Sequence, residues 1–309
     1  KRLLEFAFEK DPEGTVPDFD LPSIKTDLKN LDPSEDVMIW FGHSSLFIQI
    51  SGKKILVDPV FSKYASPVPF TNKAFDGTNI YDVNDLPEID ILLITHDHYD
   101  HLDYPTIKKL KDKVSKVIVP LGVDAHLLRW GYDEDKITTV DWDDEVVIDD
   151  NLKIYALEAR HFSGRSFFNR NQSLWVSYLI EEKINNKNYK LFLSGDGGYS
   201  GRFKEFKERF GKIDFAAMES GQYNKEWSLI HSKPEDVLMA SQDMEVENLL
   251  PIHNSKFKLS NHTWDDPLKR LDELTKNTNI KLLTPIIGEK IYLHKENSFS
   301  KWWENIENK

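Results

Sequence analysis

The sequence contains no cysteine among its 309 residues. Disulfide bonds, thiolate nucleophiles and cysteine-bound zinc are therefore excluded, although the absence does not indicate a redox compartment. Any metal ligand in this protein has to come from histidine, aspartate or glutamate. The chain has 10 histidines and 52 acidic residues from which such a site can be built.

Positive charge and long apolar runs are also scarce. The 40 lysines and arginines are outnumbered by the acidic residues, and the formal net charge is −12. Because nucleic-acid binding depends on a cationic surface, we expect no nucleic-acid partner. No apolar run approaches the roughly 18 residues that span a bilayer, and no secretory segment opens the chain. The chain starts at Lys1, so the expected location, cytoplasmic or membrane-associated, depends on whether an upstream anchor has been removed.

The residues that are present suit a large globular core, since 39% are hydrophobic and these include 8 Trp, 11 Tyr and 18 Phe. Strand-like segments lie between residues 37 and 58 and at 89–95. A β-rich stretch follows at 136–194, and strands then alternate with helices up to residue 285. This order predicts an α/β fold of two packed sheets with helices on both outer faces, and disfavours a single doubly wound sheet. We expect an N-terminal arm, residues 1–35, packed on one domain, residues 36–309.

The most informative segment is residues 95–103, which reads Thr-His-Asp-His-Tyr-Asp-His-Leu-Asp directly after an apolar run. In an extended segment, side chains at i and i+2 share a face, so His96 and His98 are placed to bind one ion. Asp100 and His101 follow where the chain turns, which points them toward a second ion. Imidazole together with carboxylate suits zinc, with manganese or iron as alternatives. A histidine-rich polar loop is the plainer interpretation, but the ordered HxHxDH spacing disfavours it.

Three more metal-competent residues lie just beyond predicted strands. His161 follows the strand at 154–160, Asp196 follows the strand at 189–194 within a glycine-rich segment, and His253 follows the strand at 249–252. A single histidine in such a place is more often structural. Three such residues together with the HxHxDH segment favour a metal site.

The other polar candidates rank lower. Asp58, at the end of the segment 55–57, is a candidate to hold a ligand imidazole through its second nitrogen. His43 is expected either beside the ligands or in the core. His231 and His262 precede helices and are placed to reach a substrate. The remaining histidines are expected on the surface or in packing contacts: His126 and His294.

The order of these residues resembles the metallo-β-lactamase superfamily, in which an HxHxDH segment is followed by a single histidine, an aspartate and a final histidine. The resemblance covers nearly the whole chain. Related branches look like sugar-phosphate lactonases, so the scaffold admits several substrates. The resemblance to the superfamily implies a four-layer αβ/βα sandwich with the site at one edge. Finer motifs are similar to the N-acyl-phosphatidylethanolamine phospholipase D-like branch, at residues 40–45, 57–62, 95–103, 159–165, 194–199 and 230–235.

The resemblance also implies roles for single residues. The implied ligands of two zinc ions are His96, His98 and His161 for the first and Asp100, His101 and His253 for the second, with Asp196 as the bridge. His231 matches a histidine that lines the active site, and is expected to donate a hydrogen bond to a phosphoryl oxygen. After the last ligand, however, the branch reads His-Trp-Gly-Thr-Phe, whereas residues 253–257 read His-Asn-Ser-Lys-Phe. Because the Trp-Gly pair shapes the pocket wall, this departure leaves the substrate open.

We therefore expect a two-zinc metallohydrolase that cleaves a phosphodiester, with a phospholipid such as N-acyl-phosphatidylethanolamine as substrate. A metal-bridging hydroxide would attack the phosphorus, and the expected catalytic residues are Asp100, Asp196 and His231. Two alternatives stay open: a lactonase or a hydrolase of a soluble phosphodiester or sugar phosphate on the same metals, and a non-catalytic metal-binding relic. The expected substrate contacts are Tyr99, Arg165, Phe167, Phe168, Tyr223, Asn254 and His262.

Aromatic residues in the loops at 60–76 and 162–170 have two interpretations. Together with Arg165 and Arg170, they would form an apolar, locally cationic mouth for an anionic lipid and give peripheral membrane contact. They equally fit packing under their own loops. The expected partner is a small-molecule or phospholipid substrate, and the sequence leaves the oligomeric state open.

Overall fold

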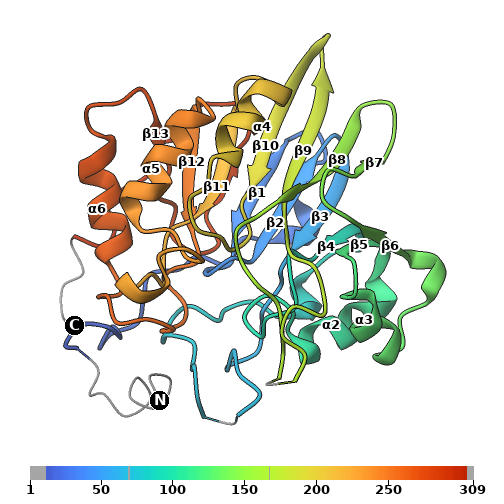
Figure 1. Ribbon diagram of the computed structural model, residues 1–309, viewed down its shortest axis with the longest axis horizontal. Coiled ribbons are helices and arrows are strands. Elements are labelled where there is room, and N and C mark those ends of the chain that lie inside the picture. The colour runs from blue at the N-terminus through green and yellow to red at the C-terminus, as the bar shows by residue number, and fades with distance from the viewer. Residues whose placement is uncertain (1–11, 69, 167, 305–309) are drawn as a thin grey trace.

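Two seven-stranded sheets form the centre of the computed structural model, which describes residues 12–68, 70–166 and 168–304 (Figure 1). The first sheet has the order β14-β1-β2-β3-β4-β5-β6. Strands β3 to β6 pair in parallel, whereas β14, β1, β2 and β3 pair antiparallel. The strands are β1 (Val37–Trp40), β2 (Leu46–Ile50), β3 (Lys53–Val57), β4 (Ile89–Leu93), β5 (Val114–Pro120), β6 (Ile137–Val140) and β14 (Lys290–Tyr292).

The second sheet has the order β13-β12-β11-β10-β9-β8-β7. Strands β10 to β13 pair in parallel, and β7 to β10 pair antiparallel. Strands β8, β10 and β12 therefore run in the same direction and end at the same edge. The strands are β7 (Glu145–Val147), β8 (Leu152–Glu158), β9 (Val176–Ile184), β10 (Lys187–Leu193), β11 (Phe215–Glu219), β12 (Asn248–Ile252) and β13 (Lys281–Leu282).

Helices cover the outer face of each sheet, which makes four layers (Figure 1). The first sheet packs on α2 (Tyr104–Leu110) and α3 (Asp124–Arg129), and the second on α4 (Arg202–Phe210), α5 (Pro234–Asp243) and α6 (Asp266–Thr275). A third apolar cluster fills the space between the sheets. Because both faces of each sheet are covered, the central strands are near-continuous apolar runs. Short 3-10 helices are η1 (Leu28–Asn30), η2 (Val83–Asp85), η3 (Lys111–Lys113), η4 (Glu134–Lys136) and η5 (Lys225–Trp227).

These layers confirm the predicted four-layer αβ/βα sandwich. The strand-like run at 37–50 is nevertheless two strands, because the chain turns between β1 and β2. Gly42 has a φ of +82° and His43 a φ of 54°, and this left-handed backbone cannot continue a strand. Strand β14 was not predicted. It has only three residues and pairs with β1, from which it is separated by most of the chain.

The described part of the predicted N-terminal arm, residues 12–35, lies against the sandwich. The N–H of Leu21 donates to the carbonyl of Asp76 at 2.9 Å, and the N–H of Ile24 donates to the carbonyl of Ile287 at 2.8 Å. Residues 1–11 of the arm lie outside the described residues. Within the part of the chain that the structure describes, no helix has the length and apolar character needed to cross a membrane.

Candidate metal centre

The predicted ligands meet at one edge of the sandwich, where strands of both sheets end. His96, His98, Asp100 and His101 follow β4 of the first sheet. The second sheet contributes the residues that follow β8, β10 and β12, namely His161, Asp196 and His253. The shared direction of these strands therefore brings segments from distant parts of the sequence to one place.

A first set of ligand atoms comes from His96, His98, His161 and Asp196, whose atoms all lie within 4.8 Å of one another. Nε2 of His96 lies 2.9 Å from Nδ1 of His98, and Nε2 of His161 lies 3.2 Å from the same atom. Two nitrogen ligands of a tetrahedral zinc, each at about 2.0–2.1 Å from the ion, lie about 3.3–3.4 Å apart. The spacing of the three imidazoles therefore fits one shared ion.

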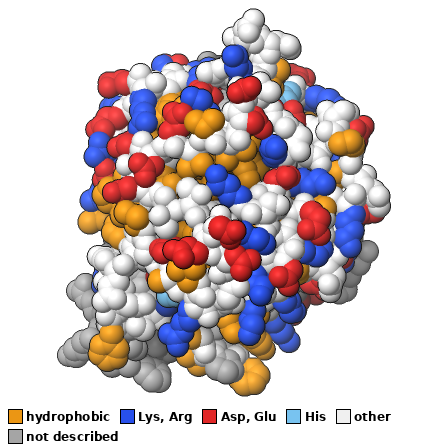
Figure 2. Space-filling model, turned by 90° about the vertical axis from the view of Figure 1, so that its right-hand side faces the viewer, with side chains coloured by type: hydrophobic (Ala, Val, Ile, Leu, Met, Phe, Trp, Pro, Cys, Tyr) orange, Lys and Arg blue, Asp and Glu red, His pale blue; other side chains and the backbone are white. Residues whose placement is uncertain are grey.

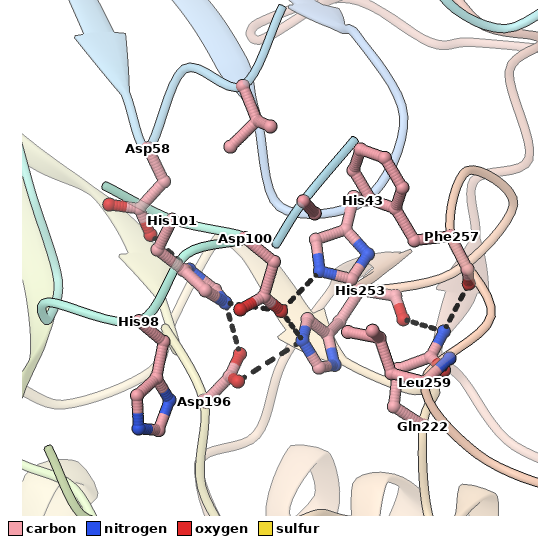
Figure 3. A network of polar contacts seen from close by, with 12 residues as sticks. His43, Asp58, His98, Asp100, His101, Asp196, Gln222, His253, Phe257 and Leu259 are labelled. Atoms are coloured by element: carbon pink, nitrogen blue, oxygen red, sulfur yellow. Dashed lines mark hydrogen bonds and ion pairs between the residues drawn. The ribbon is translucent and has the colours of Figure 1, made fainter. Parts of the chain in front are cut away.

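A second set comes from Asp100, His101, His253 and His43, again within 4.8 Å of one another. Oδ2 of Asp100 lies 3.3 Å from Nε2 of His253 and 3.6 Å from Nε2 of His101. His43 makes a 2.8 Å hydrogen bond through Nε2 to the same carboxylate oxygen. Figure 3 shows His43, Asp100 and His253 turned toward one another. His43 is thus placed to orient Asp100.

Asp196 lies between the two sets. Its Oδ1 is 3.1 Å from Nε2 of His101, and its Oδ2 is 3.1 Å from Nε2 of His253 (Figure 3). The same Oδ2 is 3.7 Å from Nε2 of His161 and 3.8 Å from Nε2 of His96. One carboxylate therefore reaches imidazoles of both sets, which is the geometry that a bridging ligand needs.

The second nitrogens of the imidazoles are held by the protein. Nδ1 of His101 lies 2.7 Å from Oδ2 of Asp58, and that carboxylate also accepts hydrogen bonds from the N–H and hydroxyl of Thr95. Nδ1 of His161 donates to the carbonyl of Ile230 at 2.9 Å. Such contacts fix the tautomer and the ring orientation of metal-binding histidines. Asp58 therefore lies where the sequence analysis expects it to act.

The electrostatics of the site favour a cation. Burial lowers the pKa of His161 well below its ordinary value, so this ring is neutral and able to bind a metal. Burial alone would also lower the pKa of His101, but the carboxylates of Asp196, Asp100 and Asp58 together raise it well above its ordinary value. The three carboxylates therefore make positive charge favourable in the buried site.

Polar atoms at the centre of the site also lack well-aligned partners among the described residues. Nε2 of His101 and Oδ1 of Asp196 face each other and are buried without a well-aligned hydrogen bond. Unpaired buried polar atoms are costly. An ion bound by both atoms would remove this cost, so the residues that are present fit a metal.

Glu219, at the end of β11, was missed by the sequence analysis. Its side chain is 1% exposed, and its carboxylate accepts hydrogen bonds from Nδ1 of His231 and from the N–H of Gly197, next to Asp196. Nδ1 of His253 lies 3.4 Å from the same carboxylate. The one available signal was its place as the last residue of a buried strand, close to the strand ends that precede the predicted ligands.

Gln222 was also missed, and it supports the loop that follows β12. Its Nε2 donates to the carbonyls of His253 and Phe257, at 3.3 and 3.0 Å, and its Oε1 accepts from the N–H of Leu259 at 2.7 Å (Figure 3). Its backbone has a φ of 58°. No local sequence pattern marks these contacts, because the loops meet only in the folded chain.

Two of the predicted substrate contacts hold the ligand loop. The guanidinium of Arg165 donates through Nη1 to the carbonyls of Asp97 and Leu102, both at 2.7 Å, and stacks 4.0 Å from the ring centre of Tyr99. The hydroxyl of Tyr99 donates to the carbonyl of Arg165 at 2.9 Å. These contacts fasten the segment 97–102, which carries ligands of both sets. A role in substrate binding stays a prediction for Arg165 and Tyr99.

The other predicted substrate contacts differ in exposure. Asn254 is buried and donates to the carbonyl of Ile252, and both ring nitrogens of His262 are bound to backbone groups. The ring of Tyr223 stacks on His262, and its hydroxyl donates to Asp266. Phe168, in contrast, is 91% exposed. Phe167 lies outside the described residues.

A family model described as a β-lactamase superfamily domain matches residues 53–254 of the 309. The chain belongs to the metallo-β-lactamase superfamily. An uncharacterized relative from Mycobacterium tuberculosis is 32% identical over 306 residues, which cover 98% of this chain and 81% of the relative. The mitochondrial N-acyl-phosphatidylethanolamine-hydrolyzing phospholipase D of Saccharomyces cerevisiae is 33% identical over 243 residues, covering 76% of this chain and 51% of that enzyme.

Solved structures show the same superfamily fold. An isothiocyanate hydrolase from Delia radicum gut bacteria superposes with a TM-score of 0.64 at 18% identity, over 82% of this chain and 98% of that one. At this identity the likeness concerns the fold alone. Together with the clustered histidines and aspartates, the family assignment makes this chain a metallohydrolase of the metallo-β-lactamase superfamily.

Proposed function

We propose that this metallo-β-lactamase superfamily member is a two-zinc phosphodiesterase that acts on a phospholipid. The observation that carries the proposal is the position of Asp196, whose carboxylate reaches imidazoles of both ligand sets. A pair of metal ions suits a phosphoryl centre, because the attacking and the leaving oxygen can be stabilised together. The yeast relative with 33% identity, named for hydrolysis of N-acyl-phosphatidylethanolamine, supports the same substrate class.

The residues that would hold the two ions are the seven predicted ligands. His96, His98 and His161 would bind the first ion, Asp100, His101 and His253 the second, and Asp196 both. When bound, two such ions lower the pKa of water and neutralise charge on phosphoryl oxygens.

His231 is the candidate proton donor of the chain. Its Nδ1 is bound to the buried carboxylate of Glu219, and its side chain is 16% exposed. A carboxylate at Nδ1 fixes the orientation of the ring, as in catalytic triads. A proton on Nε2 of His231 would then be placed for donation to a phosphoryl oxygen or to the leaving alkoxide.

Exposed apolar side chains support a lipid substrate. Phe70 is 83% exposed and Val68 is 56% exposed in the loop 60–76, and Phe168 is 91% exposed in the loop 162–170. Both loops lie at the lower end of the molecule in Figure 1, and Figure 2 shows hydrophobic side chains beside lysines and arginines at that end. Apolar side chains among cations suit insertion between the headgroups of anionic lipids. We therefore propose peripheral membrane contact through these two loops.

A substrate panel tests the proposal. Metal-free protein, reconstituted with Zn²⁺, is assayed on vesicles of long-chain N-acyl-phosphatidylethanolamine, on a soluble chromogenic phosphodiester and on a simple lactone. We expect two zinc ions per chain, activity lost on chelation and regained with Zn²⁺, and faster hydrolysis of the phosphodiesters than of the lactone. A lactone hydrolysed faster than every diester would move the assignment to a lactonase. A protein that binds zinc without hydrolysing any of the three would favour the non-catalytic alternative.

A further inference from the structure

Of the lysines that the structure describes, only Lys256 is buried, with 1% of its surface exposed. It lies three residues after the ligand His253, in the segment that departs from the similar branch. Its Nζ donates to the carbonyl of Phe41 at 3.1 Å and to the carbonyl of Val60 at 2.9 Å. A buried ammonium is costly unless it is hydrogen-bonded, and burial lowers the pKa of Lys256 to about 7. The two hydrogen bonds therefore offset part of the cost of burying Lys256.

The two carbonyls belong to segments that serve the second ligand set. Phe41 lies two residues before His43, which is hydrogen-bonded to Asp100. Val60 lies two residues after Asp58, which holds Nδ1 of His101. Lys256 itself is joined through the chain to His253. One amine thus connects three segments, each of which carries or supports one ligand of the second set.

Each of the three segments has a residue other than glycine with a left-handed backbone. His43 has a φ of 54°, Asp58 a φ of 41° and His253 a φ of 64°. Residues other than glycine adopt such left-handed conformations at a cost, and keep them only where the surrounding structure fixes them. The hydrogen bonds of Lys256 supply such a constraint at a point common to all three segments.

Packing around the aliphatic part of Lys256 is equally close. A Cβ placed on Gly42 would lie 3.1 Å from Cδ and 3.2 Å from Cβ of Lys256, so the glycine allows this side chain to pack closely against the backbone. The ring centres of Phe257 and Phe61 lie 5.8 and 6.0 Å from Nζ. The amine is therefore held between two backbone carbonyls and two aromatic rings.

From this geometry we infer that Lys256 is a positioning residue that sets the affinity of the second metal position, formed by Asp100, His101, His253 and Asp196. The inference rests on the proposed two-metal function. The first position depends on His96, His98 and His161, and within the described residues Lys256 makes no hydrogen bond to the segments that carry them. Loss of the amine should therefore weaken one metal position and spare the other.

The test is a Zn²⁺ titration of metal-free protein by calorimetry, with bound zinc counted after gel filtration. Lys256→Met removes the amine and keeps a similar side-chain length. Lys136→Met is the matched control, because Nζ of Lys136 also donates to two backbone carbonyls, those of Lys111 and Val114, near the start of β5. His161→Gln and His253→Gln, which each remove a ligand from one set, assign the two binding steps.

We expect Lys256→Met to raise the Kd of the second step at least tenfold and to change the first less than twofold, with neither step changed in Lys136→Met. Equal weakening of both steps, or no weakening, would overturn the inference. If Lys256→Met does not fold by circular dichroism, Lys256→Gln is held to the same criteria, because its shorter side chain cannot reach both carbonyls. A wild-type protein that binds only one zinc would instead refute the two-metal function itself.

Discussion

Substitution of Glu219 by glutamine tests whether this buried carboxylate prepares His231 for proton transfer. The carboxylate accepts a charge-assisted hydrogen bond from Nδ1 of His231 and another from the N–H of Gly197. A hydrogen bond to a charged group contributes about 1.5–3 kcal/mol, so its loss in the transition state lowers kcat roughly 10- to 150-fold. Glutamine has nearly the same size and can still accept from Gly197, so we expect the fold to be retained.

The assay measures kcat and KM for a soluble chromogenic phosphodiester across pH, with zinc content determined on the same samples. Glu208→Gln, on the exposed face of α4, is the control for loss of one negative charge. We expect Glu219→Gln to lower kcat, while KM and zinc content stay within about twofold of wild type. A kcat within twofold of wild type would refute the reasoning. A fall in kcat that matches a loss of zinc would show that Glu219 acts through His253 instead.

Three further predictions concern other parts of the molecule. Asp196→Asn should lower turnover at least roughly 100-fold with an unchanged circular dichroism spectrum, because an amide cannot give charge to two ions; near-normal turnover would mean that Asp196 is not the bridge. Phe168→Ser should slow hydrolysis of vesicle lipid about tenfold and that of a soluble diester less than twofold, and equal effects on both would assign the ring to loop structure. Burial alone would lower the pKa of His294, but Asp36 and Glu182 raise it to about 9. The stabilisation by protonated His294 is therefore complete below pH 6.5 and is lost as the pH rises through 9. In urea unfolding, we expect His294→Gln to be about 1–2 kcal/mol less stable than wild type at pH 6. Near pH 10, the variant and the wild type should be equally stable.

Local patterns in the sequence predicted much of the fold. The β-rich stretch at 136–194, together with the alternation of strands and helices that follows it, led to the correct prediction of two packed sheets with helices on both outer faces. Pairings between remote segments were not predictable in this way. Strand β14 joins β1 through three residues, which is too short a pattern to recognise. The break between β1 and β2 arises from the left-handed backbone of Gly42 and His43, where a single glycine within a long apolar run is only a weak signal.

In the candidate site, too, local patterns were predictable and contacts between remote segments were not. The seven residues could be proposed as ligands because each follows a buried strand, and the structure brings them together. Glu219 is the last residue of a buried strand, and a single glutamate in that place gives no signal that separates it from a structural residue. The tethers made by Gln222 and Lys256 depend on contacts between loops, so no spacing in the sequence could have indicated them.

The division of the ligands between the two sheets has a consequence for how the protein is made. The segment after β4 supplies two residues to each ligand set, and residues that follow β8 and β10 complete the first set, whereas the second also needs His253 after β12. In a nascent chain, the donors of the first set are therefore all present once Asp196 has been synthesised, and those of the second only after His253. Because each ligand set joins the two sheets, its donors come together only where the sheets pack on each other. Ions bound there would therefore stabilise the packing of one sheet on the other and oppose their separation.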